Sequence, residues 1–215
     1  MTDPAYLLAM LRSHAISHGD RRCHLLIDRV ITYRRLWSRI ERASARLQCE
    51  WGVAPSDTVA YVGTGHPDAI VLYAALLRIG ANFLPTELDA EDLPSRAKVS
   101  AIITSAHAKV VVTDDAISLE HPTAKPLSLL LAGWCYGDPI LANEDPAAAS
   151  LLLPSPTGVI RRLSLQALCA ALPRTATSLQ VTGAIFTPDR LKNLILPALR
   201  DAQTLRFSAV EPGGL

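Results

Sequence analysis

The sequence predicts an α/β protein with a layered, largely parallel β-sheet that is covered by helices on both faces. Two observations lead to this class. Short apolar or β-branched runs alternate along the chain with stretches of helical periodicity, which is the order that parallel sheets require. Hydrophobic residues make up 49% of the 215 residues, and the mean hydropathy is +0.22, so the chain can form a sizeable core without disulfides or metals.

The N-terminal third contains a predicted amphipathic helix. Thr32 is placed to cap a helix that extends to about Gln48, and Gly52 is a typical residue to follow its end. One apolar stripe at helical spacing is formed by Tyr33, Leu36, Trp37, Ile40, Ala43 and Leu47. A turn is predicted at 55–57 and a strand at 58–62.

A second predicted helix should be buried. Pro67 suits the first turn of a helix, and the following sequence DAIVLYAALLRIG ends at Gly80. This segment is apolar almost all round, and a helix of that kind is expected inside the protein. A short strand is predicted directly after it, at 81–85.

The remaining elements are predicted with weaker signals. Residues 114–148 are expected to be mostly loop, with one short strand near 127–131, and a soft boundary lies within them, although a single domain over 1–215 is favoured. Pro197 should kink or end the helix that contains it. The other expected elements are a helix around 92–106, strands at 109–113 and 151–153, a helix at about 164–172, a strand at 178–186, a helix from Thr187 and Pro188, and a final strand at 204–210.

Net charge, cysteine spacing and the N-terminal sequence argue against several functional classes and cellular locations. The net charge of +1 gives no electrostatic footprint for nucleic acid. The cysteines share no CxxC spacing, which argues against a zinc or redox motif and fits a reduced compartment. Asp3 and Pro4 stand where a signal peptide carries positive charge, and no apolar run is long enough to span a bilayer. We therefore expect a soluble cytoplasmic protein without a membrane span or a nucleic-acid partner.

A more specific pattern covers about residues 25–115. Its order and spacing resemble the opening of the adenylate-forming superfamily, which contains acyl- and aryl-CoA synthetases, peptide-synthetase adenylation domains and luciferases. The matching positions are Thr32, Tyr33, Leu36, Gly52, Val53, Asp57, Val59, Ala74, Gly80 and Pro85, followed by SAHAKVVVTDD at 105–115. The resemblance implies the fold of the N-terminal subdomain of acyl-CoA synthetases. These positions pack and turn the chain, and the resemblance implies no chemistry for them.

The chemistry that the resemblance implies begins in LLLPSPTGVIRRLSLQAL, residues 151–168. The family has a glycine- and hydroxyl-rich loop with a lysine after this strand, because backbone N–H groups must approach phosphate oxygens closely. On that loop we place Ser155, Thr157 and Gly158 as candidate phosphate-binding residues, with Arg161 and Arg162 as candidates for compensating charge.

This loop departs from the family's pattern. Pro154 and Pro156 each lack a donor N–H and restrict φ, and the lysine segment is missing because Val159 follows Gly158 directly. The family's Thr-His pair has no counterpart. A structural turn is therefore favoured over a working ATP site, and the two arginines are favoured as the solvated start of a helix.

Other candidate chemistry is weak. His14 and His18 have the i, i+4 spacing of a helical metal pair, but two surface histidines are favoured because no acidic partner accompanies them. GTG at 63–65 is a weak phosphate motif between a strand and a helix. Asp114 and Asp115 either pair as acids or mark a turn after a strand. No GxSxG occurs, so a hydrolase is not expected, and we assign no catalytic or metal-binding residue.

The leading hypothesis is a truncated, degenerate homologue of ATP-dependent acyl- or aryl-acid adenylating ligases, since the family's members are more than twice this length. We expect no catalysis and no cofactor for the chain alone, but a binding or scaffolding module. Its exposed apolar face would be covered by self-association or by a hetero-partner protein.

Two alternatives remain at this stage. The chain is one subunit of a split AMP-forming acid–thiol ligase, in which Ser155, Thr157 and Gly158 contact ATP or AMP with Mg²⁺ once a partner completes the site. Otherwise it is a sensor that binds a small acyl or aryl acid in a remaining cleft.

Overall fold

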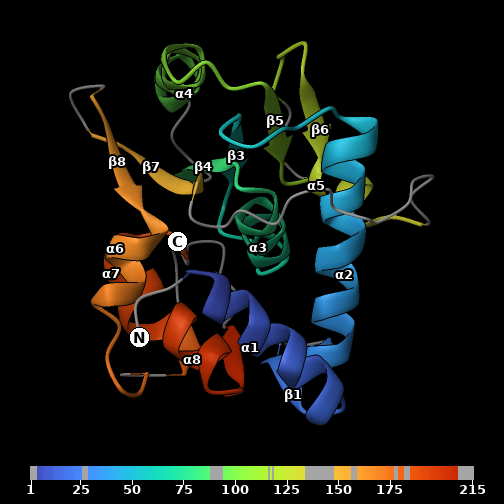
Figure 1. Cartoon of the computed structure of the whole chain (residues 1–215). Coiled ribbons are helices and arrows are strands. Elements are labelled where there is room, and N and C mark those ends of the chain that lie inside the picture. The colour runs from blue at the N-terminus through green and yellow to red at the C-terminus, as the bar shows by residue number, and fades with distance from the viewer. Residues whose placement is uncertain are drawn as a thin grey trace, which may run out of the picture.

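The computed structural model describes residues 4–25, 29–87, 94–115, 117, 119–133, 148–155, 159–176, 179–181 and 185–207 (Figure 1). The helices are α1 (Pro4–Ser17), α2 (Tyr33–Ala45), α3 (Ala69–Ile79), α4 (Pro94–Ser105), α5 (Leu127–Leu131), α6 (Leu165–Ala170), α7 (Pro188–Arg190) and α8 (Leu196–Arg200), with π-helical turns η1 (Arg46–Glu50) and η3 (Leu191–Ile195). The strands are β1 (Arg22–Leu25), β2 (Val30–Thr32), β3 (Thr58–Gly63), β4 (Asn82–Glu87), β5 (Val110–Thr113), β6 (Ala124–Pro126), β7 (Ser150–Pro154), β8 (Ile160–Ser164), β9 (Gln180–Val181) and β10 (Leu205–Phe207).

Two β-sheets organise these elements. The larger sheet has the strand order β6-β5-β3-β4-β7-β8, and its neighbours run parallel except for the antiparallel pair β7 and β8. The smaller sheet has the order β2-β1-β10-β9, in which the early strand β1 pairs in parallel with the late strand β10. The predicted α/β class with largely parallel pairing is confirmed, with the difference that the strands are divided between two sheets.

Helix α3 fills the space between the sheets. All eleven of its residues are buried, as the apolar sequence predicts. Its core cluster also contains side chains of β3, β4 and β5 from the larger sheet and of β1, β9 and β10 from the smaller one. Gly80 ends the helix with a left-handed φ of 81°, a conformation that glycine adopts without a steric penalty, and its N–H caps the last turn.

Strand β3 shows how helices cover both faces of the larger sheet. Val59 and Tyr61 point into the cluster that contains α3, whereas Ala60 and Val62 point into a second cluster on the opposite face. Side chains from α4 complete this second cluster, and Figure 1 shows α4 and α3 on opposite sides of the strands. Helix α2 is amphipathic as predicted, and the hydroxyl of Thr32 accepts its capping hydrogen bond from the Arg35 N–H.

Several elements differ from the sequence-based expectation. Helix α1 is not among the elements predicted from the sequence, because its buried stripe includes a histidine and its exposed face includes Ile16 and two alanines. The buried positions are Leu7, Leu8, Leu11, His14 and Ala15. The strand predicted near 127–131 is wrong: α5 forms there, and Leu127 and Leu130 are buried at helical i, i+3 spacing. The short strand β6 precedes it, within the segment expected to be loop.

The C-terminal part differs in detail. The expected strand at 178–186 is represented by β9 at 180–181, and residues 177–178 and 182–184 lie outside the described residues. The helix does not end at Pro197. Pro197 stands in the first turn of α8, which directly continues the π-helical turn η3, so the helical backbone runs on through the proline. The single domain over 1–215, with its soft boundary within 114–148, stays a prediction.

The helices described in the structure are all too short or too polar to cross a lipid bilayer.

We predict that the core around α3 carries a large share of the stability. Leu72→Ala removes a fully buried side chain and leaves a cavity, so it should lower the free energy of unfolding by about 2–5 kcal/mol in urea titrations. The control Ile16→Ala, at a side chain 75% exposed on α1, should change it by less than about 0.5 kcal/mol. Equal effects of the two substitutions would contradict the central place of α3.

Candidate functional site

The candidate phosphate loop lies in the hairpin of β7 and β8. Ser155 follows β7, and its backbone N–H donates to the carbonyl oxygen of Val159 over 2.9 Å. The Val159 N–H in turn donates to the Ser155 hydroxyl oxygen over 3.1 Å. Ser155 therefore closes the turn with both its backbone and its side chain. Thr157 and Gly158, the other two candidates of this loop, lie outside the described residues.

Arg161 and Arg162 lie in strand β8, so their predicted place at the start of a helix is wrong. They form a strand because the backbone of β8 pairs with β7, with Arg161 opposite Leu153 and Arg162 opposite Leu152. Leu152 packs in the cluster that contains α4, and Leu153 packs against the cluster that contains α3. Opposed residues share a face, so the two exposed guanidinium groups project from opposite faces of the sheet. One arginine at most can face an anion held on a given side of the turn.

A second group of polar side chains lies at the carboxyl ends of β3 and β5. The carboxylate of Asp114 is buried and accepts hydrogen bonds from the Tyr61 hydroxyl at 2.7 Å, the Thr64 N–H at 2.8 Å and the Thr64 hydroxyl at 3.3 Å. The Tyr61 oxygen accepts from the His66 N–H at 3.0 Å. Asp114 thus fixes the loop after β3, which is the GTG motif at 63–65.

The first glycine of that motif has a steric role. A Cβ at Gly63 would lie 2.2 Å from the Tyr61 hydroxyl oxygen and 2.5 Å from a carboxylate oxygen of Asp114. The glycine is required because these two side chains approach the backbone closely. This fully explains the residue without a bound phosphate.

Asp68 is the centre of an ion-pair cluster next to this loop. It is buried immediately before α3, and its two carboxylate oxygens accept from Arg29 at 2.5 Å and from Arg39 at 2.7 Å. Its N–H donates to Nδ1 of His66 over 3.2 Å. Sequence reasoning missed this cluster, because the three charged residues are scattered along the chain and share no spacing.

His24 lies near the same cluster. Its ring is fully buried in β1 and meets Phe207 edge-on, with ring centres 5.4 Å apart. Neither ring nitrogen has a hydrogen-bond partner among the described residues. Burial lowers the pKa of His24 to about 4; Asp68 opposes this shift, and Arg39 and Arg29 reinforce it.

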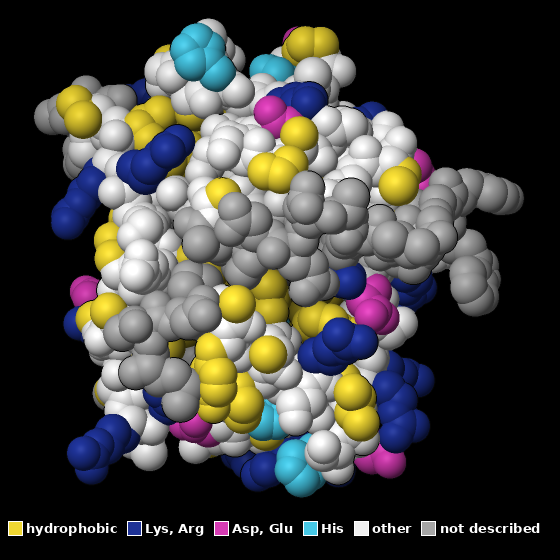
Figure 2. Space-filling view, in the orientation of Figure 1, with side chains coloured by type: hydrophobic (Ala, Val, Ile, Leu, Met, Phe, Trp, Pro, Cys, Tyr) yellow, Lys and Arg dark blue, Asp and Glu magenta, His cyan; other side chains and the backbone are white. Residues whose placement is uncertain are grey.

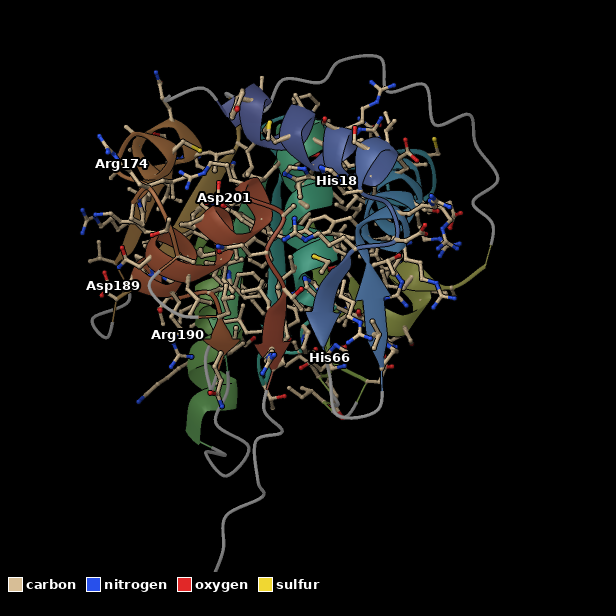
Figure 3. The ribbon with its side chains drawn as sticks, turned by 90° about the horizontal axis from the view of Figure 1, so that it is seen from below. His18, His66, Arg174, Asp189, Arg190 and Asp201 are labelled. Atoms are coloured by element: carbon tan, nitrogen blue, oxygen red, sulfur yellow. The ribbon has the colours of Figure 1, made fainter. Side chains whose placement is uncertain are left out.

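The two histidines near the end of α1 differ in solvent exposure. His14 is buried and its Nε2 lies 2.7 Å from the carbonyl oxygen of Arg200, so its predicted place on the surface is wrong. His18, which directly follows α1 and is labelled in Figure 3, is exposed. Within the described ranges, no three His, Cys, Asp or Glu side chains gather closely enough to hold a metal ion.

Comparison with known proteins identifies relatives of this architecture. The sequence model of a family described as AMP-binding enzyme matches residues 11–162. No curated protein sequence matches the chain significantly.

Solved structures match nearly the whole chain. The N-terminal subdomain of Klebsiella oxytoca NpsA is 19% identical, with a TM-score of 0.72 over 97% of this chain and 54% of that one. O-succinylbenzoate coenzyme A synthetase from Bacillus subtilis in complex with AMP is 13% identical, with a TM-score of 0.68 over 92% and 55%. A nonribosomal peptide synthetase is 15% identical, with a TM-score of 0.76 over 97% and 23%. The chain therefore spans about half the length of the first two structures and less of the third, and the likeness shows the fold.

We predict that His24 makes the protein sensitive to acid. Its pKa is about 4 in the folded state against 6.5 in the unfolded state, so below pH 6.5 the unfolded chain takes up a proton that the folded one does not. Stability should fall as the pH falls from 6.5 towards 4, and His24 should account for roughly 2 kcal/mol of the loss between pH 7 and pH 5.

The measurement is urea unfolding at both pH values. His24→Leu should reduce the difference between them by that amount, whereas His18→Gln, at an exposed ring, should leave the difference unchanged. An unaltered difference in His24→Leu would show that other groups cause the acid sensitivity.

Proposed function

The chain belongs to the AMP-binding enzyme family, and we propose that these 215 residues by themselves act as a binding or scaffolding module rather than as an adenylating catalyst. The family match and the fold of an N-terminal subdomain supply the background for this proposal. The single observation that carries it is the internal bonding of the turn between β7 and β8.

A phosphate-binding loop needs free donors that converge on one anion. In this turn, the Val159 N–H is already bonded to the Ser155 hydroxyl, and the Ser155 N–H is bonded to the Val159 carbonyl. Pro154 and Pro156 have no N–H to offer. The arginines nearest to the turn diverge to opposite faces. Each of these features favours a structural turn over an ATP site.

The edge of the larger sheet supports an interaction role. Strand β8 ends the strand order, and within the described part of the chain it pairs with β7 alone. An edge strand presents backbone donors and acceptors to another chain. Val159, which precedes β8, is 66% exposed and adds apolar surface there. We propose that a second copy or another protein covers this edge.

The other large hydrophobic side chains that the structure describes as exposed are scattered. They are Ile16, Val30, Leu129 and Leu179, each on a different segment. We therefore propose that a partner covers the edge of β8 rather than a separate exposed apolar face. A cytoplasmic location is part of the same proposal, and the free thiols of Cys23, Cys49 and Cys169 suit a reducing compartment.

A second candidate function is one subunit of a split acyl- or aryl-acid ligase. The observation that favours it is the exposure of Arg161 and Arg162 on strand β8. A guanidinium group of this kind is available to a phosphate that a partner protein brings. ATP with Mg²⁺ would then bind in the completed assembly and not in this chain alone.

We predict that the purified chain gives no binding heat with millimolar Mg-ATP in isothermal titration, with or without an aryl or fatty acid. The reason is that the N–H groups of Ser155 and Val159, the backbone donors that the structure describes in this turn, are already bonded to acceptors within it. Micromolar binding that is weakened by Arg161→Gln or Arg162→Gln, but not by Arg35→Gln on α2, would contradict the proposal and favour the ligase subunit.

A further inference from the structure

Strand β3 lies at the topological switch point of the larger sheet, where successive strands are added first on one side of it and then on the other. The next strand in the chain, β4, pairs with one edge of β3, and the following strand, β5, pairs with its other edge. The helices after β3 and β4 lie on opposite faces of the sheet. In open α/β sheets, ligands bind in the crevice outside the carboxyl ends of the strands at such a switch point.

The structure has a cavity of about 460 Å³ at this place. Its wall combines the loop after β3, the residues after β5, two arginines from elsewhere in the chain and the short helix α5. None of the described residues of the β7–β8 turn lines it, and β4 stands between β3 and β7 in the sheet. We call this cavity the switch-point cleft.

One group of side chains in the wall of the cleft is positive. Arg29 and Arg39 share the single carboxylate of Asp68, and each uses one nitrogen for that bond. Because a guanidinium has five N–H donors, both retain donors, and the trio has one surplus positive charge. Nδ1 of His66 accepts from the Asp68 N–H, which places the proton of the neutral ring on Nε2 as a further donor. Figure 3 shows His66 at the end of the molecule opposite His18.

A second group of side chains in the wall is negative. Asp115 is exposed, and one of its carboxylate oxygens accepts the Ser128 N–H over 3.2 Å. Asp114 lies beside it in the wall and adds a buried negative charge whose oxygens are bonded to Tyr61 and Thr64. Side chains of Leu127 and Leu131 from α5 line the cleft as well, so its wall also has an apolar part.

We propose that the switch-point cleft binds a small zwitterion, an aliphatic molecule with a carboxylate at one end and an ammonium at the other. Among the described residues that line the cleft, two arginines and three aspartates leave one net negative charge. A phosphate dianion would add to that charge, whereas a zwitterion adds none and has a partner for each of its charges in the wall. Its carboxylate binds Arg29, Arg39 and His66, its ammonium binds Asp115, and its methylene groups lie on Leu127 and Leu131.

The test compares three probes of equal chain length by titration calorimetry: 6-aminohexanoate, hexanoate and hexylamine. We expect 6-aminohexanoate to bind at least ten times more tightly than either probe that lacks one charge. Its addition should shift the backbone amide signals of Thr64, His66 and Ser128 in NMR spectra. Equal affinity for the three probes, or no binding of any of them, would overturn the proposal.

Matched variants distinguish the contributions of the negative and the positive side chains of the cleft to binding. Asp115→Asn should weaken 6-aminohexanoate about ten-fold and leave hexanoate unchanged, while the control Glu120→Gln, at an exposed acid outside the cleft, has no effect. Arg29→Gln should weaken 6-aminohexanoate and hexanoate, and the fold should be retained because Arg39 still pairs with Asp68. If Asp115→Asn binds 6-aminohexanoate as the parent chain does, the proposed orientation is wrong. These readouts use no nucleotide, so they are independent of the function proposed for the β7–β8 turn.

Discussion

The complete burial of α3 is the constraint on which the rest of the structure depends. A helix without a polar face needs apolar neighbours on every side, and one sheet can cover only one of its sides. Strand β4 of the larger sheet and helix α2 contact α3, and side chains of α1 and of the small sheet belong to the same core cluster. This requirement is consistent with the pairing of β1 with β10, two strands that are far apart in sequence.

The same helix sets the position of the polar groups. The end of β3 and the start of α3 are separated by five residues, 64–68, so the loop must carry its charges close to the sheet. Asp68 is held there by two arginines, and Asp114 holds the beginning of the loop from the neighbouring strand β5. The buried core and the cleft at its edge are therefore parts of one arrangement, in which Gly63 gives the room that Tyr61 and Asp114 need.

Local sequence signals were sufficient where one element had one clear pattern. The cap at Thr32, the stop at Gly80 and the apolar run of α3 all have short-range physical causes, and each was found from the sequence. Helix α5 was mistaken for a strand because five residues with four leucines fit either structure, and tertiary contacts of Leu127 and Leu130 decide between them. Helix α1 is harder to predict because His14 interrupts the apolar pattern of its buried face and Ile16 lies on its exposed face.

The candidate functional sites also contain features that local sequence signals predict and features that depend on tertiary contacts. The departures of the β7–β8 loop from a phosphate-binding pattern were visible in the sequence, because prolines and missing lysines are local features. The divergence of Arg161 and Arg162 was not, since it depends on their pairing as a strand. In the cluster of Asp68 with Arg29 and Arg39, the aspartate is 39 positions from the first arginine and 29 from the second. No sequence motif marks contacts over such separations.

Hydrogen exchange of the native chain, measured with and without Mg-ATP, tests the central claim most directly. We expect the slowest exchange for the amides of α3, because the packing of this buried helix supplies the stability. We expect no added protection of residues 155–162 when Mg-ATP is present, because the N–H groups of Ser155 and Val159 are bonded within the turn. Protection of that segment by Mg-ATP, or faster exchange in α3 than in the strands around it, would contradict the account.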